Sequence, residues 1–259
     1  MANVKLNQRI AETPGVSRVF VYPAMNDSGT GAGAAMVLRA AASGMRPIQL
    51  PDVFLGPGFS RRDVEEALSG RALATRRMAD PGGEIAGLLA QGKTVARCAG
   101  RMEYGPRALG NRSILFQASD ARANQWLNEK LKRTEFMPFA PATLAEEAHR
   151  CYRNLEVAAD AARFMTITYD CTDFMKQASP AAVHVDGTAR PQLVDRETNP
   201  SFHAILSAYH RKTGIPSVLN TSFNIHEEPI VCSPSDAVVT FLAGELDYLV
   251  MEDLLVSRS

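Results

Sequence analysis

Three arginines, Arg101, Arg107 and Arg112, fall within one short run at 100–113 that reads GRMEYGPRALGNRS. The run also holds three glycines and a proline, which let a backbone turn sharply and come close to a ligand. An arginine presents a planar fork of donors that suits a phosphate or a carboxylate. These residue types predict a cradle for an anion; the alternative is an ordinary arginine-rich surface turn.

Convergence of the three guanidinium groups has a physical cost. Their mutual repulsion requires an anion among them, or acceptors such as Glu103 and neighbouring carbonyl groups. Each charge-assisted hydrogen bond to an anion contributes roughly 1.5–3 kcal/mol. We expect Arg107 and Arg112 to act on the ligand directly and Arg101 to help bind it, and we expect at least one of the three to be structural.

Amides and hydroxyls alternate in a second run, NTSFN at 220–224, which follows an apolar stretch typical of a strand. Strand ends are where α/β sheets place ligands. Asn220, Ser222 and Asn224 offer the hydrogen bonds that a carbamoyl group or an adenine needs, although an Asx turn accounts for the same residues. Neutral donors also stand in the first run, at Asn111 and Ser113.

Cations gather in Lys130-Leu131-Lys132-Arg133, at the expected end of a helix and before the apolar run FMPFAP at 136–141. Cations at a helix C-terminus interact favourably with the helix dipole, which is the simpler interpretation. The functional interpretation is a phosphate clamp, in which the apolar run excludes water. Its candidate residues are Lys132 and Arg133.

A turn in the run HVDGTAR at 184–190 brings the Thr188 hydroxyl and Arg190 to one place. A lone histidine beside a strand, such as His184, is more often structural than catalytic.

Near the N-terminus, the loop NDSGTGAG at 26–33 places Asp27 and small residues at the start of a helix. A carboxylate there suits a metal ion, with backbone N–H groups toward phosphate. Capping of the helix by Asp27 or Ser28 explains the pattern equally well.

These candidates must be positioned by alternating elements, since helix and strand patterns follow one another from about Asp80. Pattern and capping signals predict a fold that is α+β or α/β, with a mixed twisted sheet and helices on its faces. We expect helices at 32–43, 60–68, 84–91, 120–132, 201–213 and 235–243, with an amphipathic helix within residues 1–10. We expect strands at 16–22, 93–99, 113–117, 140–144, 164–169, 182–185, 191–194, 215–219 and 248–251.

Composition limits the partners. Of the 259 residues, 28 are Lys or Arg and 28 are Asp or Glu, so the formal net charge is zero, which argues against bulk binding to nucleic acid or to an anionic membrane. The sequence has no apolar stretch of membrane-spanning length and no secretory signal pattern. The four cysteines lack C-x-x-C spacing, which indicates reduced thiols in a cytoplasmic protein.

The run GRMEYGPRALGNRS closely resembles the signature of the carbamoyltransferase family that includes the nodulation-factor and antibiotic carbamoyltransferases. Further resemblance runs, in the family's order, through the segments at 133–141, 184–190 and 220–224. The similarity spans nearly the whole chain but only the C-terminal part of the family's usual length. It implies a C-terminal fragment of an actin-like transferase domain with a connector at 1–59, and a YrdC-like domain at 60–259.

The resemblance implies that the second domain binds carbamoyl phosphate and ATP with Mg²⁺ and forms carbamoyl adenylate. The carbamoyl group would then pass to a hydroxyl of a small acceptor. It adds Arg133 to Arg107 and Arg112 as catalytic, and Thr188 and Arg190 as ligand contacts. Asp27 matches a family metal ligand whose partner histidines lie in the missing upstream actin-like half, so we expect metal there only in the full-length protein, and no completed transfer by the fragment.

Two alternative functions and one departure from the family pattern stay open. The chain could be a threonylcarbamoyl-adenylate synthase-like enzyme, which uses bicarbonate and threonine. It could instead be a catalytically silent binding module, and an exposed apolar face on its first forty residues would support this and drive formation of a homodimer. Finally, Glu227 stands where the family usually has a glycine, which puts the role of Asn224 in question.

Overall fold

Local signals in the sequence set the ends of the helices. The computed structural model describes residues 2–44, 50–130, 139–225 and 228–258. At the start of α3 (Arg61–Leu68), Ser60 and Asp63 form both halves of a capping box. Helix α9 (Pro200–Thr213) begins with a proline behind the Asn199 cap and ends at Gly214, whose φ is +74°.

The remaining elements follow in chain order. The other helices are α1 (Val4–Ala11), α2 (Thr30–Ser43), α4 (Pro81–Ala90), α5 (Ala123–Lys130), α6 (Ala148–Cys151), α7 (Ala159–Ala162), α8 (Asp173–Ala178) and α10 (Pro234–Ala243). The strands are β1 (Leu73–Arg77), β2 (Val95–Cys98), β3 (Arg112–Phe116), β4 (Ala140–Leu144), β5 (Tyr169–Asp170), β6 (Thr188–Ala189), β7 (Gln192–Val194), β8 (Ser217–Ser222), β9 (Tyr248–Met251) and β10 (Leu254–Arg258).

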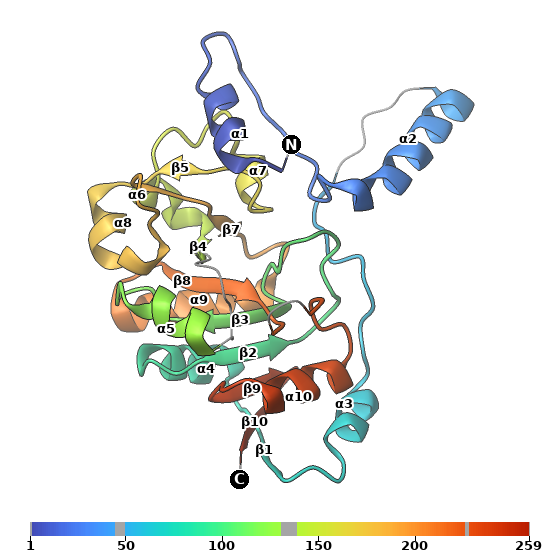
Figure 1. The fold of residues 1–259 in the computed structure, drawn as a ribbon, viewed down its shortest axis with the longest axis vertical. Coiled ribbons are helices and arrows are strands. Elements are labelled where there is room, and N and C mark those ends of the chain that lie inside the picture. Colours follow the sequence, from blue (N-terminus) through green and yellow to red (C-terminus); the bar gives the residue numbers. More distant parts are fainter. Residues whose placement is uncertain (1, 45–49, 131–138, 226–227, 259) are drawn as a thin grey trace.

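Eight strands form one mixed sheet in the order β1-β10-β9-β2-β3-β8-β4-β7. The pairs β2–β9 and β4–β7 are parallel and the others are antiparallel. Helices α4 and α9 cover one face, and α5 and α10 cover the other (Figure 1). The expected mixed sheet with helices on its faces is confirmed.

Successive side chains along a strand point to opposite faces of the sheet and pack into the two hydrophobic cores. In β9, Val250 belongs to the core shared with α4 and α9, whereas Leu249 and Met251 belong to the core on the opposite face. Strands β2, β3 and β4 are buried along their whole length, as expected for a sheet covered on both sides. The ends of β2 and β3 are therefore rigid supports for the loop between them.

Helix α2 projects away from the rest of the chain (Figure 1). None of its residues is buried, and the side chains of Val37 and Leu38 are 68% and 71% exposed. Its small residues, expected to allow close packing, have no described helix or sheet to pack on. Among the described residues, no helix is long and apolar enough to cross a membrane.

Three expected strands differ from the structure. The segment 16–22 joins no sheet; its one ladder-like bond runs from the Val19 N–H to the Val157 carbonyl. Residues 182–185 follow a 3-10 turn that begins at Pro180, and of 164–169 only Tyr169 lies in a strand. The expectation of free thiols is confirmed, since all four cysteines are free.

Candidate functional site

The loop between β2 and β3 carries the arginine run, and it contains an unpaired arginine. Arg107 is largely buried, its Nε–H has no hydrogen-bond partner, and no carboxylate of the described residues pairs with its side chain. Burial lowers the pKa of Arg107 because a charged guanidinium is less stable away from water. An anion bound beside Arg107 would offset the energetic cost of this arrangement.

Arg190, in the link between β6 and β7, is the second unpaired arginine. No described hydrogen bond or ion pair involves its side chain. Its pKa is lowered to about 9, first by burial and then by repulsion from Arg107. Arg107 and Arg190 are thus neighbours with like charges and no described acidic partner.

Two amide side chains fix the backbone beside Arg107. Asn220 donates from Nδ2 to the carbonyl of Ala108 at 3.2 Å and to Oε1 of Gln192 at 2.8 Å. Gln192 in turn donates to the carbonyl of Leu109 at 2.7 Å. The Oδ1 atom of Asn220 is buried and has no partner, so the residue that holds the backbone next to Arg107 also carries an unused acceptor.

The backbone of the same turn adds donors. Among the described residues, the N–H groups of Gly105, Arg107 and Ala108 have no hydrogen-bond acceptor. Gly105 has a φ of +112°, which suits glycine and bends the chain before Pro106. Free N–H groups in a tight turn form a concave anion site, which matches the two arginines in sign.

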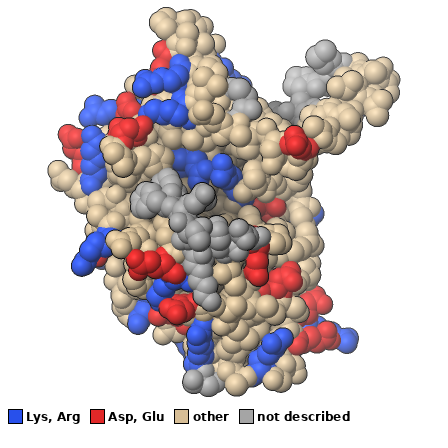
Figure 2. All heavy atoms as spheres, in the orientation of Figure 1, with Lys and Arg blue, Asp and Glu red and all other residues tan. Residues whose placement is uncertain are grey.

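Figure 2 shows where charge gathers on one face of the molecule. A cluster of basic atoms lies in a hollow near the middle of this face, between the region of α1 and the sheet. A positive hollow favours a negatively charged ligand.

Arg112 is held by the protein itself. Its guanidinium donates to the carbonyls of Ala99, Gly100, Asn111 and Cys232 at 2.9–3.2 Å, and the residue is 1% exposed. These carbonyls take up the donors of Nε and Nη1. The expectation that at least one of the three arginines is structural is confirmed here, while its proposed catalytic role stays a prediction.

Arg101 is also bound to backbone oxygens. It donates to the carbonyls of Leu55 and Gly56 at 2.8 and 3.0 Å, and its side chain is exposed. It thereby ties the arginine run to the preceding segment of chain.

Asn111 and Ser113, expected as neutral donors to a ligand, are engaged inside the loop. Oδ1 of Asn111 accepts from Arg97 and from Asn199, both at 2.9 Å, and its Nδ2 donates to the carbonyl of Arg101 at 2.8 Å. Ser113 accepts the N–H of Gly110 at 2.9 Å. The geometry gives both side chains a part in shaping the loop.

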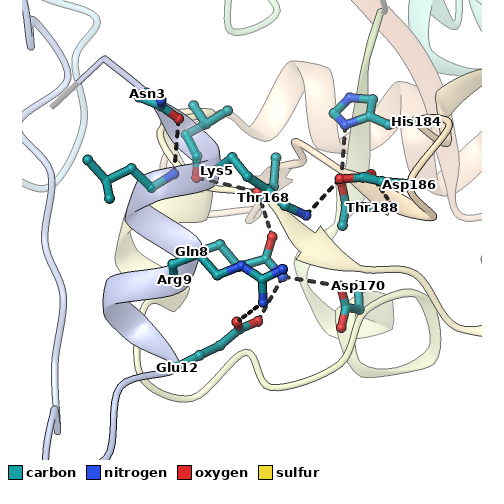
Figure 3. Close-up of polar contacts among 12 residues, drawn as sticks. Asn3, Lys5, Gln8, Arg9, Glu12, Thr168, Asp170, His184, Asp186 and Thr188 are labelled. Carbon is teal, nitrogen blue, oxygen red and sulfur yellow. Dashed lines mark hydrogen bonds and ion pairs between the residues drawn. The ribbon is translucent and has the colours of Figure 1, made fainter.

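Thr188 begins β6, directly after a turn that also contacts α1. Its hydroxyl donates to Asp186 at 2.6 Å and lies 3.2 Å from Nδ1 of His184, while Asp186 pairs with Lys5 at 2.8 Å (Figure 3). The hydroxyl, expected to contact ligand, is thus bonded two residues before Arg190 and fixes the turn that leads to it. Burial lowers the pKa of His184, consistent with a neutral structural histidine.

Asn220 and Ser222 lie within β8, because this strand ends at residue 222 and not at residue 219 as expected. Ser222 donates to Oδ1 of Asn224 at 2.7 Å, and Asn224 donates to the carbonyl of Glu228 at 2.7 Å. Ser222 and Asn224 therefore bond to one another, whereas Asn220 joins the Arg107 turn.

Three predicted residues remain to be located. Lys132 and Arg133 lie outside the described residues. Asp27 is exposed in the 3-10 turn before α2, and no group of three or more His, Cys, Asp or Glu side chains suited to a metal occurs in the described part of the chain. The described residues alone do not fit a metal ion at Asp27.

Sequence reasoning missed Gln192 and Arg97 and gave Glu103 the wrong partners. Glu103 accepts backbone N–H groups, not guanidinium groups. Residue type alone carries no signal for these contacts, because each depends on chain segments distant in sequence.

The fold and the site define a mixed α/β protein with an unpaired arginine pair beside β2, β3 and β8. The model of the carbamoyltransferase C-terminus family matches residues 86–258. The chain therefore belongs to the carbamoyltransferase C-terminus family.

Relatives agree with this assignment. The chain is 37% identical to nodulation protein NolO of Bradyrhizobium diazoefficiens, covering 99% of this chain and 47% of NolO. It is 36% identical to nodulation protein NolNO of Sinorhizobium fredii, covering 99% and 38%, and 35% identical to an uncharacterized protein of Methanocaldococcus jannaschii, covering 100% and 43%. The chain thus spans less than half the length of these relatives.

Among solved structures, full-length HypF in a phosphate- and nucleotide-bound form is similar with a TM-score of 0.46 and 18% identity, over 72% of this chain and 22% of HypF. HypF of T. kodakarensis is similar with a TM-score of 0.43 and 15% identity, over 74% and 24%. At this level, the structural similarity adds nothing to the family assignment.

Proposed function

We propose that this chain is the nucleotide-activating part of a carbamoyltransferase, which binds carbamoyl phosphate and ATP with Mg²⁺ and forms carbamoyl adenylate in a YrdC-like domain. The observation that carries the proposal is the buried pair Arg107 and Arg190, which has no described carboxylate partner. Family membership supplies the carbamoyl group as the moiety to be activated.

The two unused polar atoms suit a carbamoyl group. The carbamoyl NH₂ needs an acceptor, which the orphan Oδ1 of Asn220 provides, and the carbamoyl oxygen needs a donor, which Nε of Arg107 provides. Arg190 and the free N–H groups of the turn would neutralise phosphate. The same residues that are unsatisfied alone are satisfied by this one ligand.

The proposed chemistry needs binding and charge neutralisation. Water releases phosphate from carbamoyl phosphate and leaves carbamate. A carbamate oxygen then forms a bond to the α-phosphorus of ATP, and pyrophosphate leaves from that phosphorus. Arg107 and Arg190 would lower the repulsion between the two anions and raise their effective concentration, with Lys132 and Arg133 as further proposed contacts.

Transfer to a small hydroxylated acceptor would require the additional length that the relatives have. We propose that residues 1–59 contribute to that second, actin-like unit, with Asp27 as one ligand of a metal held there. The exposed, unpacked α2 supports this division. Mixing this chain with the unmatched half of NolO should give a complex that Leu38→Asp weakens; no complex, or one insensitive to Leu38, would oppose the division.

Isothermal titration with carbamoyl phosphate and with ATP tests the activation step, together with release of pyrophosphate from ATP. Arg107→Gln and Arg190→Gln should each weaken carbamoyl phosphate binding, whereas Arg71→Gln, an exposed arginine without a described side-chain contact, should not. Pyrophosphate release driven by bicarbonate plus threonine, and not by carbamoyl phosphate, would replace this proposal with the threonylcarbamoyl-adenylate alternative. No binding of either ligand would reject it.

A further inference from the structure

A buried carboxylate organises one half of the arginine loop. Glu103 is 6% exposed, and its Oε1 accepts the backbone N–H groups of Leu109, Asn111 and Arg112 at 2.6, 2.8 and 3.2 Å. Three N–H groups on one carboxylate oxygen form a strong, charge-assisted set. These donors point inward, toward Glu103, and are unavailable to a ligand.

A buried guanidinium organises the carbonyl side of the same half. Arg97, on β2, donates to the carbonyl of Gly110 and to Oδ1 of Asn111, and its other amino group donates to Ser201 at 2.6 Å. Arg97 is 3% exposed and lies over the ring of Phe202, 5.9 Å from the ring centre. It therefore fastens the loop to the N-terminus of α9.

Opposite charges compensate one another across the loop. Burial lowers the pKa of Arg97 to about 10, while attraction to Glu103 and Glu252 acts in the other direction. Glu252 also accepts the N–H of Gly100 at 2.7 Å, where the loop leaves β2. The charge of Arg97 is thus compensated by Glu103 and Glu252. Neither carboxylate pairs with Arg107.

The two halves of the loop between β2 and β3 differ in how many of their polar groups have hydrogen-bond partners. Residues 109–112 have their N–H and carbonyl groups bound from within, whereas the N–H groups of 105, 107 and 108 and the Arg107 side chain have no described partner. An unpaired buried arginine persists only where surrounding contacts fix the backbone, because the free loop would turn it to water.

We propose that Glu103 and Arg97 are positioning residues for the anion site: they hold the loop between β2 and β3 so that Arg107 stays unpaired beside Arg190. Neither side chain touches the ligand. The inference rests on the proposed function only for the choice of carbamoyl phosphate as the ligand.

The test compares two carboxylates that both bind backbone. Glu103→Gln removes the charge under the loop. The matched control is Asp247→Asn, because Asp247 accepts the N–H and hydroxyl of Thr94 at 2.8 and 2.7 Å at the opposite end of β2. Both variants should lower the melting temperature, so stability alone does not separate a positioning role from a structural one.

Two readouts separate them. Carbamoyl phosphate affinity should fall roughly tenfold to a hundredfold in Glu103→Gln and stay unchanged in Asp247→Asn, since a small displacement of a binding group has effects of that size. In protein labelled with ¹⁵N at arginine, the Nε–H signal of Arg107, assigned with Arg107→Lys, should exchange faster with water only in Glu103→Gln. Equal affinity and an unchanged Arg107 signal in Glu103→Gln would overturn the proposal.

The two readouts also keep this inference apart from the proposed function. If the wild type binds no carbamoyl phosphate, the proposed function fails, and the Arg107 signal still decides the positioning role. If Glu103→Gln does not fold, Arg97→Lys replaces it: lysine keeps the charge but not the fork that reaches Gly110, Asn111 and Ser201. An Arg107 signal unaltered by Arg97→Lys would then overturn the proposal.

Discussion

Arg107 lowers the pKa of Arg190 at a place where burial already disfavours the charged guanidinium. Two like charges held together away from water store unfavourable energy in the ligand-free protein. The proposed binding of carbamoyl phosphate would offset that energy, because an anion between the two arginines converts repulsion into attraction.

Removing the Arg190 side chain should therefore weaken anion binding without lowering the stability of the fold. Arg190→Gln is expected to leave the free energy of unfolding unchanged or to raise it by at least about 1 kcal/mol, since each unit by which burial and repulsion lower the pKa corresponds to about 1.36 kcal/mol. Affinity for inorganic phosphate should fall about tenfold or more. Denaturant unfolding without ligand and isothermal titration measure the two effects; a large loss of stability would show that Arg190 has a structural partner.

Phosphate affinity should depend on pH through Arg190. Its folded-state pKa is about 9, well below the pKa of a free arginine side chain, so binding should weaken above about pH 9 as the guanidinium loses its proton. Between those two values the unfolded chain binds more protons than the folded one, so the same group makes stability rise with pH. Titrations from pH 7.5 to 10 should show the loss of affinity in the wild type and a flatter profile in Arg190→Gln.

Gly110 tests how closely the loop packs on α9. A Cβ there would lie 2.3 Å from the Phe202 ring, at a φ of +111°. Gly110→Ala should cost at least about 2 kcal/mol of unfolding free energy from backbone strain and overpacking. Gly87→Ala is the control, because a Cβ on this α4 residue meets nothing within 4 Å and should raise stability by about 0.5–1 kcal/mol. Equal effects of the two variants would contradict the packing described here.

Gln8 should fasten α1 to the rest of the chain. Its side chain donates to Asp170 at 3.1 Å and accepts from Thr168 at 2.8 Å (Figure 3). Gln8→Ala removes the nearer acceptor of the buried Thr168 hydroxyl, leaving it only the Val4 carbonyl at 3.4 Å, and is expected to cost about 1–3 kcal/mol of α1 docking. Amide hydrogen exchange should accelerate across α1 in this variant, but not in Arg9→Ala, whose ion pair with Glu12 is exposed. Uniform acceleration in both would oppose this assignment.

The sequence predicted the elements with strong local signals. The Ser60 capping box, the Gly214 stop and the strand at 140–144 all occur as expected. Strand β1 escaped notice because its sequence, LATRR, carries two arginines; an edge strand tolerates such charges because one side faces water. The β-branched segment 16–22 has strand composition, but no neighbouring strand pairs with it.

The family resemblance in the motifs is confirmed, yet the motif residues differ in what they do. Arg107 and Arg112 are alike in sequence, and only the fold brings the Cys232 carbonyl to Arg112 and leaves Arg107 without an acceptor. The amide of Asn220 was expected to read a ligand, and its Nδ2 binds the Ala108 carbonyl. Long-range contacts, which residue type does not encode, decide which polar groups have no partner within the protein and are free to bind a ligand.

Strand β10 is the last strand in sequence, but it lies inside the sheet, between β1 and β9. During synthesis, β1 therefore has no neighbour until residues 254–258 have left the ribosome. The sheet can close only after β10 has been made, so a chain that stops before residue 254 leaves β1 without the strand that pairs with it.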